Sequence, residues 1–204
     1  MAEKMNNLTG KEWLQESFTI WTGLNKTKEE RSTKHPALFP ASLPKKLINI
    51  YTKEPGELIL DPFMGIGSTL LAALTTGRKS VGIDLNPEYC EKAKERIKNF
   101  QFDGLDEVSP NEIFNPKVCC DNSKNLKKYV KKESVDLVVT SPPYWDILNQ
   151  RRTADHKEIK NYSNSENDIG NISDYEEFLE KLKIIFSKVY DVLKPNKRCI
   201  SVVM

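Results

Sequence analysis

A buried strand that runs into a glycine turn and then into an apolar helix limits the fold of this chain more than any other sequence feature. Residues 58–60 are Leu-Ile-Leu, residues 65 and 67 are glycines, and residues 70–74 form an apolar helical segment. Further strand segments at 80–84, 118–120 and 135–139, with helical segments at 45–51, 87–100, 123–130 and 173–193, continue the alternation. Strands that alternate with helices pair in parallel, so we predict an α/β fold with a doubly wound, mostly parallel sheet.

The glycine turn has the composition of a cradle for a nucleotide-like ligand. Gly65 and Gly67 can adopt positive φ and allow close approach, and the following helix N-terminus carries a partial positive charge. The dinucleotide pattern G-x-G-x-x-G is incomplete, because Leu70 stands at its third glycine. Asp61, at the end of the strand, would repel a pyrophosphate and attract a cationic amino-acid group. These features favour S-adenosyl-L-methionine over NAD.

A second acid, Asp84, ends the strand segment 80–84. It follows the glycines by about twenty residues, the spacing at which a carboxylate bonds ribose hydroxyls in nucleotide-binding folds. Asp84 could equally cap the helix that begins after Asn86-Pro87, since Asp and Asn are common helix caps. Both interpretations remain open at the level of sequence.

The tetrapeptide Ser141-Pro142-Pro143-Tyr144 directly follows the apolar strand segment 135–139. Prolines cannot donate backbone hydrogen bonds and hold the chain extended, so nearby carbonyl groups remain available as acceptors. Ser141 Oγ and the Pro142 carbonyl could accept both N–H bonds of a nucleobase amino group while Tyr144 stacks on the ring. This would make the amine nitrogen nucleophilic. The alternative is an ordinary rigid Pro-Pro loop.

Residues 61–67 (D-P-F-M-G-I-G) and 141–144 (S-P-P-Y) together resemble the motifs of the amino-directed DNA methyltransferases, which modify cytosine N4 or adenine N6. The resemblance covers most of the chain. It implies a Rossmann-like methyltransferase fold, S-adenosyl-L-methionine as cofactor, DNA as substrate and a restriction-modification context. It also implies that the loop containing Asp61, Phe63, Gly65 and Gly67 binds the methionine part of the cofactor, and that residues 141–144 are catalytic.

The same resemblance suggests three more cofactor-binding residues. Phe39 and Pro40 belong to the element that precedes the cofactor loop and are expected near the cofactor. Asp121, after the strand segment 118–120, is expected near the adenine amino group, although it could instead cap the helix segment 123–130. His35 precedes a proline, and we interpret it as a structural loop residue.

The proposed chemistry is direct methyl transfer to the amino nitrogen of a flipped base. Methylation at cytosine C5 would need a cysteine nucleophile, typically after a proline, and no cysteine of this chain follows one. In the family, Ser at the position of Ser141 is more common among cytosine-N4 enzymes, so the resemblance favours cytosine N4 over adenine N6. The alternatives are an RNA or protein amine methyltransferase, or a non-catalytic cofactor-binding fragment or subunit.

Composition limits the other classes of function. The chain has 204 residues and a net charge of only +2, but lysines at 124, 127, 128, 131 and 132, and Arg151, Arg152, Lys157 and Lys160, form local clusters that could contact DNA phosphates. It has no apolar run of about eighteen residues and no signal-peptide core, so we expect a cytoplasmic protein. The four cysteines lack C-x-x-C spacing, so we expect neither a metal site nor a disulfide framework.

The sequence also suggests a domain division. We expect residues 1–44 to lead into the cofactor site and residues 45–204 to form a partial catalytic domain. The apolar segment 199–204 ends the chain inside an expected strand, which suggests that a target-recognition region is absent or supplied by a second polypeptide. Ser173 and Glu176 form a capping-box pattern before the last helix segment.

Overall fold

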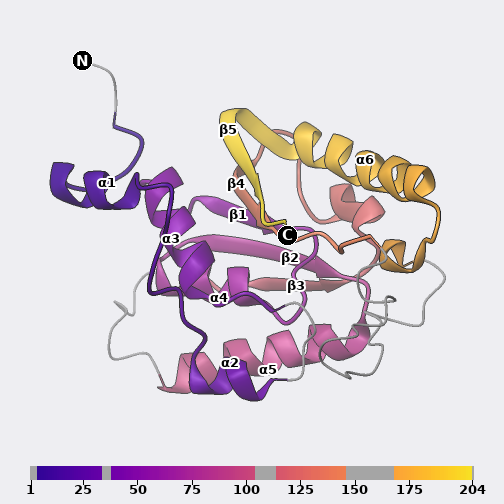
Figure 1. Cartoon of the computed structure of the whole chain (residues 1–204), viewed down its shortest axis with the longest axis horizontal. Coiled ribbons are helices and arrows are strands. Elements are labelled where there is room, and N and C mark those ends of the chain that lie inside the picture. The colour runs from indigo at the N-terminus through magenta and orange to yellow at the C-terminus, as the bar shows by residue number, and fades with distance from the viewer. Residues whose placement is uncertain (1–3, 34–37, 104–113, 146–167, 204) are drawn as a thin grey trace.

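Five parallel strands with helices on both faces make up the described part of the chain in this computed structural model (Figure 1). The structure describes residues 4–33, 38–103, 114–145 and 168–203. The strands are β1 (Leu58–Asp61), β2 (Lys79–Asp84), β3 (Lys117–Cys120), β4 (Val135–Thr140) and β5 (Leu193–Ser201). They lie in the order β3-β2-β1-β4-β5 and every pair is parallel. The predicted doubly wound α/β fold is confirmed.

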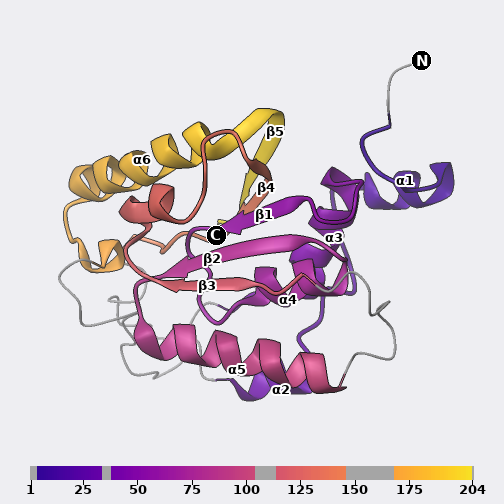
Figure 2. The same cartoon turned by 180° about the vertical axis from the view of Figure 1, so that it is seen from behind.

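Helices cover the sheet on both sides (Figure 2). They are α1 (Gly10–Glu16), α2 (Lys28–Ser32), α3 (Ser42–Tyr51), α4 (Ser68–Thr75), α5 (Pro87–Asp103) and α6 (Tyr175–Val192), with short 3₁₀ helices η3 (Ser123–Lys128) and η4 (Ile169–Asn171). Helix α6 and η3 pack on one face, and α3, α4 and α5 cover the other. No helix of the described residues is long and apolar enough to cross a membrane.

The two central strands are buried on both faces, as expected for a parallel sheet with helices on each side. Every residue of β4 is buried. On β1, Leu60 packs in the core beneath α6, whereas Ile59 packs in the core beneath α3 and α4. Alternate side chains along one strand therefore serve opposite faces of the sheet.

The strand order reverses at β1, which pairs with β2 on one side and with β4 on the other. The chain turns to opposite faces of the sheet after these two strands, which opens a crevice at their carboxyl ends. Ligands of open α/β sheets bind at such a point. Both sequence motifs, the glycine turn after β1 and the Pro-Pro tetrapeptide after β4, lie at this crevice.

Several local expectations were wrong in detail. The helix expected at 45–51 begins at Ser42, and the one expected at 123–130 is the shorter 3₁₀ helix η3. Helix α6 is capped by Asp174, whose side chain accepts the Glu177 N–H, so the capping box expected at Ser173 and Glu176 is not the one used. A one-residue shift places the carboxylate rather than the hydroxyl at the cap. Strand β5 begins at Leu193, earlier than expected.

Candidate functional site

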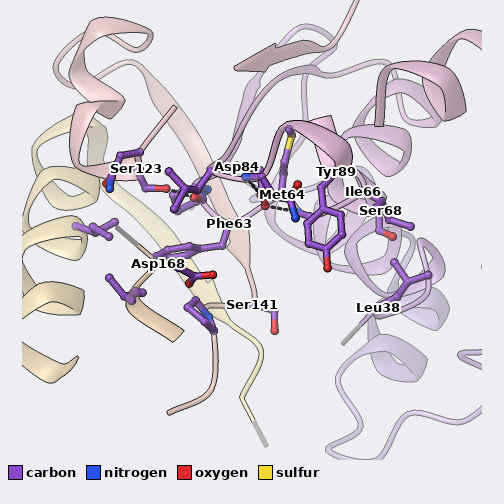
Figure 3. A pocket seen from close by; sticks show the side chains of 18 of the residues that line it. Leu38, Phe63, Met64, Ile66, Ser68, Asp84, Tyr89, Ser123, Ser141 and Asp168 are labelled. Carbon is purple, nitrogen blue, oxygen red and sulfur yellow. Dashed lines mark hydrogen bonds between the residues drawn. The ribbon is translucent and has the colours of Figure 1, made fainter. Parts of the chain in front are cut away.

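A pocket opens at the carboxyl ends of the central strands, where the loops after β1, β2, β3 and β4 meet (Figure 3). Its lining residues are Leu38, Phe39, Pro62, Phe63, Met64, Gly65, Ile66, Ser68, Asp84, Leu85, Asn86, Tyr89, Asn122, Ser123, Ser141, Pro143, Asp168, Ile169 and Ile185. Most of these side chains are apolar. The described lining contains two carboxylates and no lysine or arginine, so it suits an aromatic ligand with a positive charge better than a phosphate.

The glycine turn adopts the backbone that the sequence predicts. Gly65 has a φ of 51° and Gly67 a φ of 83°, a region that favours glycine. The Gly67 amide donates to the Met64 carbonyl at 2.9 Å, which closes the turn before α4. A Cβ on Gly67 would stand 3.1 Å from the Ala93 Cβ, so helix α5 also restricts this position.

Asp61 lies behind this turn and does not line the pocket. Its carboxylate accepts hydrogen bonds from the Phe63 amide at 3.0 Å and from the Thr140 hydroxyl at 2.7 Å. It therefore joins the end of β1 to the end of β4. Complete burial raises the pKa of Asp61 to about 6, although these hydrogen bonds favour the charged form.

Asp84 lines the pocket and also holds its backbone together. One carboxylate oxygen accepts the Gly65 amide at 2.8 Å, and the other accepts the Asn86 amide at 2.9 Å. Asn86 in turn accepts the Glu88 amide at 2.9 Å in the first turn of α5. Asp84 thus makes the cap-like contact that the sequence left open, beside the pocket position expected of a ribose ligand. Burial raises its pKa to about 7 despite the two amide hydrogen bonds, with a smaller repulsion from Asp61 and Asp168.

Asp121, which the resemblance placed near the adenine amino group, is not among the lining residues of the pocket. Its carboxylate accepts hydrogen bonds from the Asn125 side chain at 2.8 Å and from the Tyr129 hydroxyl at 2.7 Å. These hydrogen bonds lower the pKa of Asp121 to about 2. It does not cap η3 either, since the side chain of Asn122 accepts the Lys124 amide.

Asn122 and Ser123 form the pocket wall after β3 instead of Asp121. The buried Ser123 hydroxyl donates to the carbonyl of Pro62. This contact joins the loop after β3 to the glycine turn after β1. The two residues after Asp121 therefore line the pocket at the end of β3.

The Pro-Pro tetrapeptide places Ser141 and Pro143 on the pocket wall, whereas Pro142 and Tyr144 are not lining residues. Ser141 Oγ donates to the Val202 carbonyl at 3.1 Å, and the Tyr144 hydroxyl lies 2.9 Å from Ser141 Oγ. A serine hydroxyl has a single proton, so Tyr144 is the donor of the second hydrogen bond. The Val202 amide donates to the Thr140 carbonyl at 2.8 Å, so the residue after β5 bonds both the last residue of β4 and the first residue of the tetrapeptide.

The N-terminal part of the chain supplies one wall of the pocket through Leu38 and Phe39. Leu38 packs against Ile66 of the glycine turn and against Tyr89 of α5. Pro40 does not line the pocket, and its carbonyl accepts the Leu43 amide at 3.0 Å at the start of α3. Of the two residues expected near the cofactor, only Phe39 reaches the pocket.

Sequence reasoning missed several lining residues. Asp168 is the N-cap of η4 and Ile169 its first residue, far along the chain, and Ile185 comes from α6. Tyr89 of α5 was not predicted as a site residue, but its ring reaches the pocket (Figure 3). A helix-periodic aromatic one turn after Asp84 was a usable signal for Tyr89, whereas no local pattern marks Asp168.

The proposed basic clusters are only partly described. Lys127 forms an ion pair with Asp191, and Lys128 lies 3.6 Å from Asp121. His35, Arg151, Arg152, Lys157 and Lys160 lie outside the described residues. Within the described residues, no group of three or more His, Cys, Asp or Glu side chains is arranged to hold a metal ion.

Residues 2–95 match the N6_N4_Mtase family model, described as DNA methylase. This stretch contains the glycine turn and Asp84. Over this stretch the chain is similar to the amino-directed DNA methyltransferases. The cofactor of these enzymes is S-adenosyl-L-methionine. The two carboxylates of the pocket lining fit its positive charge, and the apolar side chains fit its adenine ring.

Curated relatives agree with the family. The chain is 38% identical over 87 residues to the orphan methyltransferase M.BamHII of Bacillus amyloliquefaciens, covering 41% of this chain and 32% of the relative. It is 42% identical over 80 residues to the Type II methyltransferase M2.DpnII of Streptococcus pneumoniae, covering 39% and 30%. The match to the Type II methyltransferase M.MthZI of Methanothermobacter thermautotrophicus is 32% identical over 152 residues, covering 74% and 41%. The chain thus spans roughly a third of the length of these relatives.

Among solved structures, PH0851 shares the fold with a TM-score of 0.52, at 14% identity. The superposition covers 79% of this chain and 32% of that one. At this identity the similarity concerns the fold alone.

Proposed function

We propose that this chain is the cofactor-binding and catalytic part of an S-adenosyl-L-methionine-dependent DNA methyltransferase that modifies a base amino group, in a restriction-modification system. One observation carries the proposal. Ser141 and Pro143 of the Pro-Pro tetrapeptide line the same pocket as the glycine turn and Asp84. The proposed site for the methyl donor and the proposed site for the amine are therefore adjacent.

We assign the cofactor side as follows. The glycine turn with Phe63, Gly65 and Gly67 holds the methionine part, and Asp84 accepts hydrogen bonds from the ribose with lone pairs that its two amide contacts leave unused. Asp61 contributes indirectly, because its carboxylate fixes the start of the glycine turn through the Phe63 amide. S-adenosyl-L-methionine supplies the methyl group from its sulfonium centre. We assign contact with the adenine ring to Asn122 and Ser123, which line the pocket, and not to Asp121.

The amine side depends on the hydrogen bonds of Ser141. Its hydroxyl donates to the Val202 carbonyl and accepts from Tyr144, which leaves one lone pair for an N–H of the target base. The carbonyl of Pro142 is the proposed acceptor for the second N–H, and the ring of Tyr144 is the proposed stacking surface. Both acceptors would draw the nitrogen lone pair out of the ring. The amine nitrogen would then bond the methyl carbon as the bond from that carbon to the sulfonium sulfur breaks, which leaves a neutral thioether, and the nitrogen would lose a proton to solvent.

Cytosine N4 is the proposed target rather than adenine N6, which rests on Ser141 at the first position of the tetrapeptide. Both amines offer the same two N–H donors, so the acceptors alone do not separate them. The greater length of the curated relatives supports a further proposal, that target recognition lies outside the segment 45–204, on the same polypeptide or on a second one. Residues 1–44 are proposed to lead into the cofactor site.

Binding and transfer assays test this function. Calorimetric titration should show binding of S-adenosyl-L-methionine and no comparable binding of NAD. Labelled methyl transfer is then compared for duplex DNA, RNA and protein, and the methylated nucleosides are separated after digestion. N4-methylcytosine supports the preferred target and N6-methyladenine selects the other one, whereas 5-methylcytosine contradicts the mechanism. Cofactor binding without transfer to any polymer would favour a non-catalytic subunit.

Variants of the tetrapeptide connect the activity to these residues. Ser141→Ala removes one acceptor, and loss of one such hydrogen bond in the transition state should slow transfer about ten- to a hundredfold. Tyr144→Phe keeps the ring and should retain most activity, whereas Tyr144→Ala should lose more, since base stacking contributes about 1–3 kcal/mol. Cofactor affinity should stay close to that of the parent in all three. Equal activity of Tyr144→Ala and the parent would exclude a stacking role.

A further inference from the structure

A buried arginine connects two walls of the pocket without lining it. Arg96 lies on α5 with only 8% of its surface exposed. Its guanidinium donates to the carbonyl of Ile66 at 2.8 Å. Ile66 stands between the two glycines of the turn and is itself buried. One side of the arginine therefore holds the glycine turn.

The other side of Arg96 reaches helix α2, which lies beside α5 (Figure 2). Its guanidinium bonds Glu29 at 2.7 Å and Glu30 at 3.5 Å. The two acids differ in exposure, since the side chain of Glu29 is 57% exposed and that of Glu30 only 2%. Glu29 is a surface partner, whereas Glu30 is part of the interior.

Glu30 passes the connection on to the N-terminal wall. One carboxylate oxygen accepts the Ala41 amide at 2.9 Å, and the other accepts the Thr27 amide at 2.9 Å. Ala41 is the N-cap of α3 and comes directly after the segment that brings Leu38 and Phe39 to the pocket. A continuous set of contacts thus runs from the Phe39 segment through Glu30 and Arg96 to the glycine turn.

Such a buried pair is a costly way to stabilise a fold, because both charges leave water and apolar residues of similar volume serve equally well. The pair instead fixes the relative position of two walls of the pocket. Arg96 bonds the Ile66 carbonyl in the glycine turn, and Glu30 bonds the Ala41 amide beside the Phe39 wall. We propose that Arg96 and Glu30 are positioning residues that set the separation of the Phe39 wall and the glycine turn, and thereby the affinity of the pocket for its cofactor. The inference rests on the proposed function for the identity of that cofactor.

The test compares Arg96→Lys and Glu30→Gln with Glu29→Gln. Lysine keeps the charge but cannot bond Ile66 and both acids in one plane, and glutamine keeps the shape of Glu30 without its charge. Both should raise the dissociation constant of S-adenosyl-L-methionine at least tenfold, measured by calorimetry, while the transfer rate at saturating cofactor stays near that of the parent. Glu29→Gln removes only the exposed contact and should change the constant less than twofold.

Three further measurements separate positioning from general loss of stability. Asp136→Asn removes the charge of a buried carboxylate that pairs with the partly exposed Lys194 near the amino-terminal ends of the strands. It should lower the melting temperature without weakening cofactor binding. In protein without cofactor, Arg96→Lys should increase hydrogen exchange in residues 38–41 and 64–67 together. In a protein that already carries Phe39→Ala, adding Glu30→Gln should raise the dissociation constant of the cofactor little further.

The outcomes are distinct. Failure of the parent to bind S-adenosyl-L-methionine would overturn the proposed function. A parent that binds, with folded Arg96→Lys and Glu30→Gln variants that bind equally well, would overturn the positioning role. Fully additive effects of Glu30→Gln and Phe39→Ala would do the same.

Discussion

Replacing Asp84 by asparagine should make the stability of the protein less dependent on pH. In the parent, the two carboxylate oxygens each accept one backbone amide, from Gly65 and from Asn86. Asparagine has one acceptor oxygen for these two donors, so one amide loses its partner, at a cost of about 1–3 kcal/mol. The substitution also removes a charge that the parent holds in a mostly buried position.

The sign of the pH effect follows from the pKa of Asp84. Burial raises this pKa from 3.8 to about 7, so the folded protein binds a proton more tightly than the unfolded chain. Stability from this group is fully present below about pH 4 and is lost as the pH rises through 7. A difference of about three pH units corresponds to roughly 4 kcal/mol as an upper figure. Between pH 4 and pH 8, the stability difference should therefore move in favour of the Asp84→Asn variant by up to that amount.

Urea unfolding of parent and variant at several pH values measures this shift, without cofactor present. Asp121→Asn provides a control of opposite sign, because hydrogen bonds from Asn125 and Tyr129 lower the pKa of Asp121 to about 2. Its removal should cost more above pH 4 than below it. A stability difference between parent and Asp84→Asn that is the same at pH 4 and pH 8 would refute the argument that burial controls this carboxyl group.

Two other substitutions test the packing and the charges of the sheet. A Cβ on Gly82 would stand 2.5 Å from Met64 Sδ and 2.9 Å from Met64 Cβ, so Gly82→Ala should destabilise the fold by about 1–3 kcal/mol and displace a pocket wall. Denaturant unfolding and cofactor titration check both effects against Gly10→Ala, where nothing lies within 4 Å, and unchanged values would contradict the packing. Burial alone would raise the pKa of Asp136, but hydrogen bonds and ion pairs, with Lys194 foremost, lower it. Asp136→Asn should thus destabilise the protein at pH 7 and progressively less as the pH falls below about 4. If the melting temperatures of parent and variant differed by the same amount at every pH, the ion pair between Asp136 and Lys194 would not contribute as argued.

Local sequence chemistry determined the secondary structure around the site. The run of Leu58, Ile59 and Leu60 predicted a strand buried on both faces, and Gly65 and Gly67 predicted a turn with positive φ. These features depend on one or two neighbouring residues, on steric limits of the backbone and on apolar burial. They could therefore be read without knowing what lies opposite in space.

The direction of individual polar side chains needed the tertiary structure. Asp121 follows β3 as expected, but its carboxylate accepts a hydrogen bond from the hydroxyl of Tyr129, eight residues later, and it is not among the lining residues of the pocket. Asp168 enters the pocket from a position 84 residues beyond Asp84, and the two carboxylates line the same pocket only once the chain has folded. Such choices depend on which groups meet after the strands pair, and the energy of each contact depends on burial that no local pattern encodes.

The contact between Arg96 and Glu30 likewise depends on the tertiary structure and not on a local sequence pattern. Their positions 66 residues apart carry no periodicity, and in the sequence alone each is an ordinary charged residue. Packing of α2 against α5 removes them from water and gives each a backbone partner on a different wall. The sequence by itself thus determined the strands, the glycine turn and the Pro-Pro tetrapeptide, because those are properties of neighbouring residues. The tertiary structure alone decided how the walls of the pocket are held together, because buried charges acquire their partners only when distant segments meet.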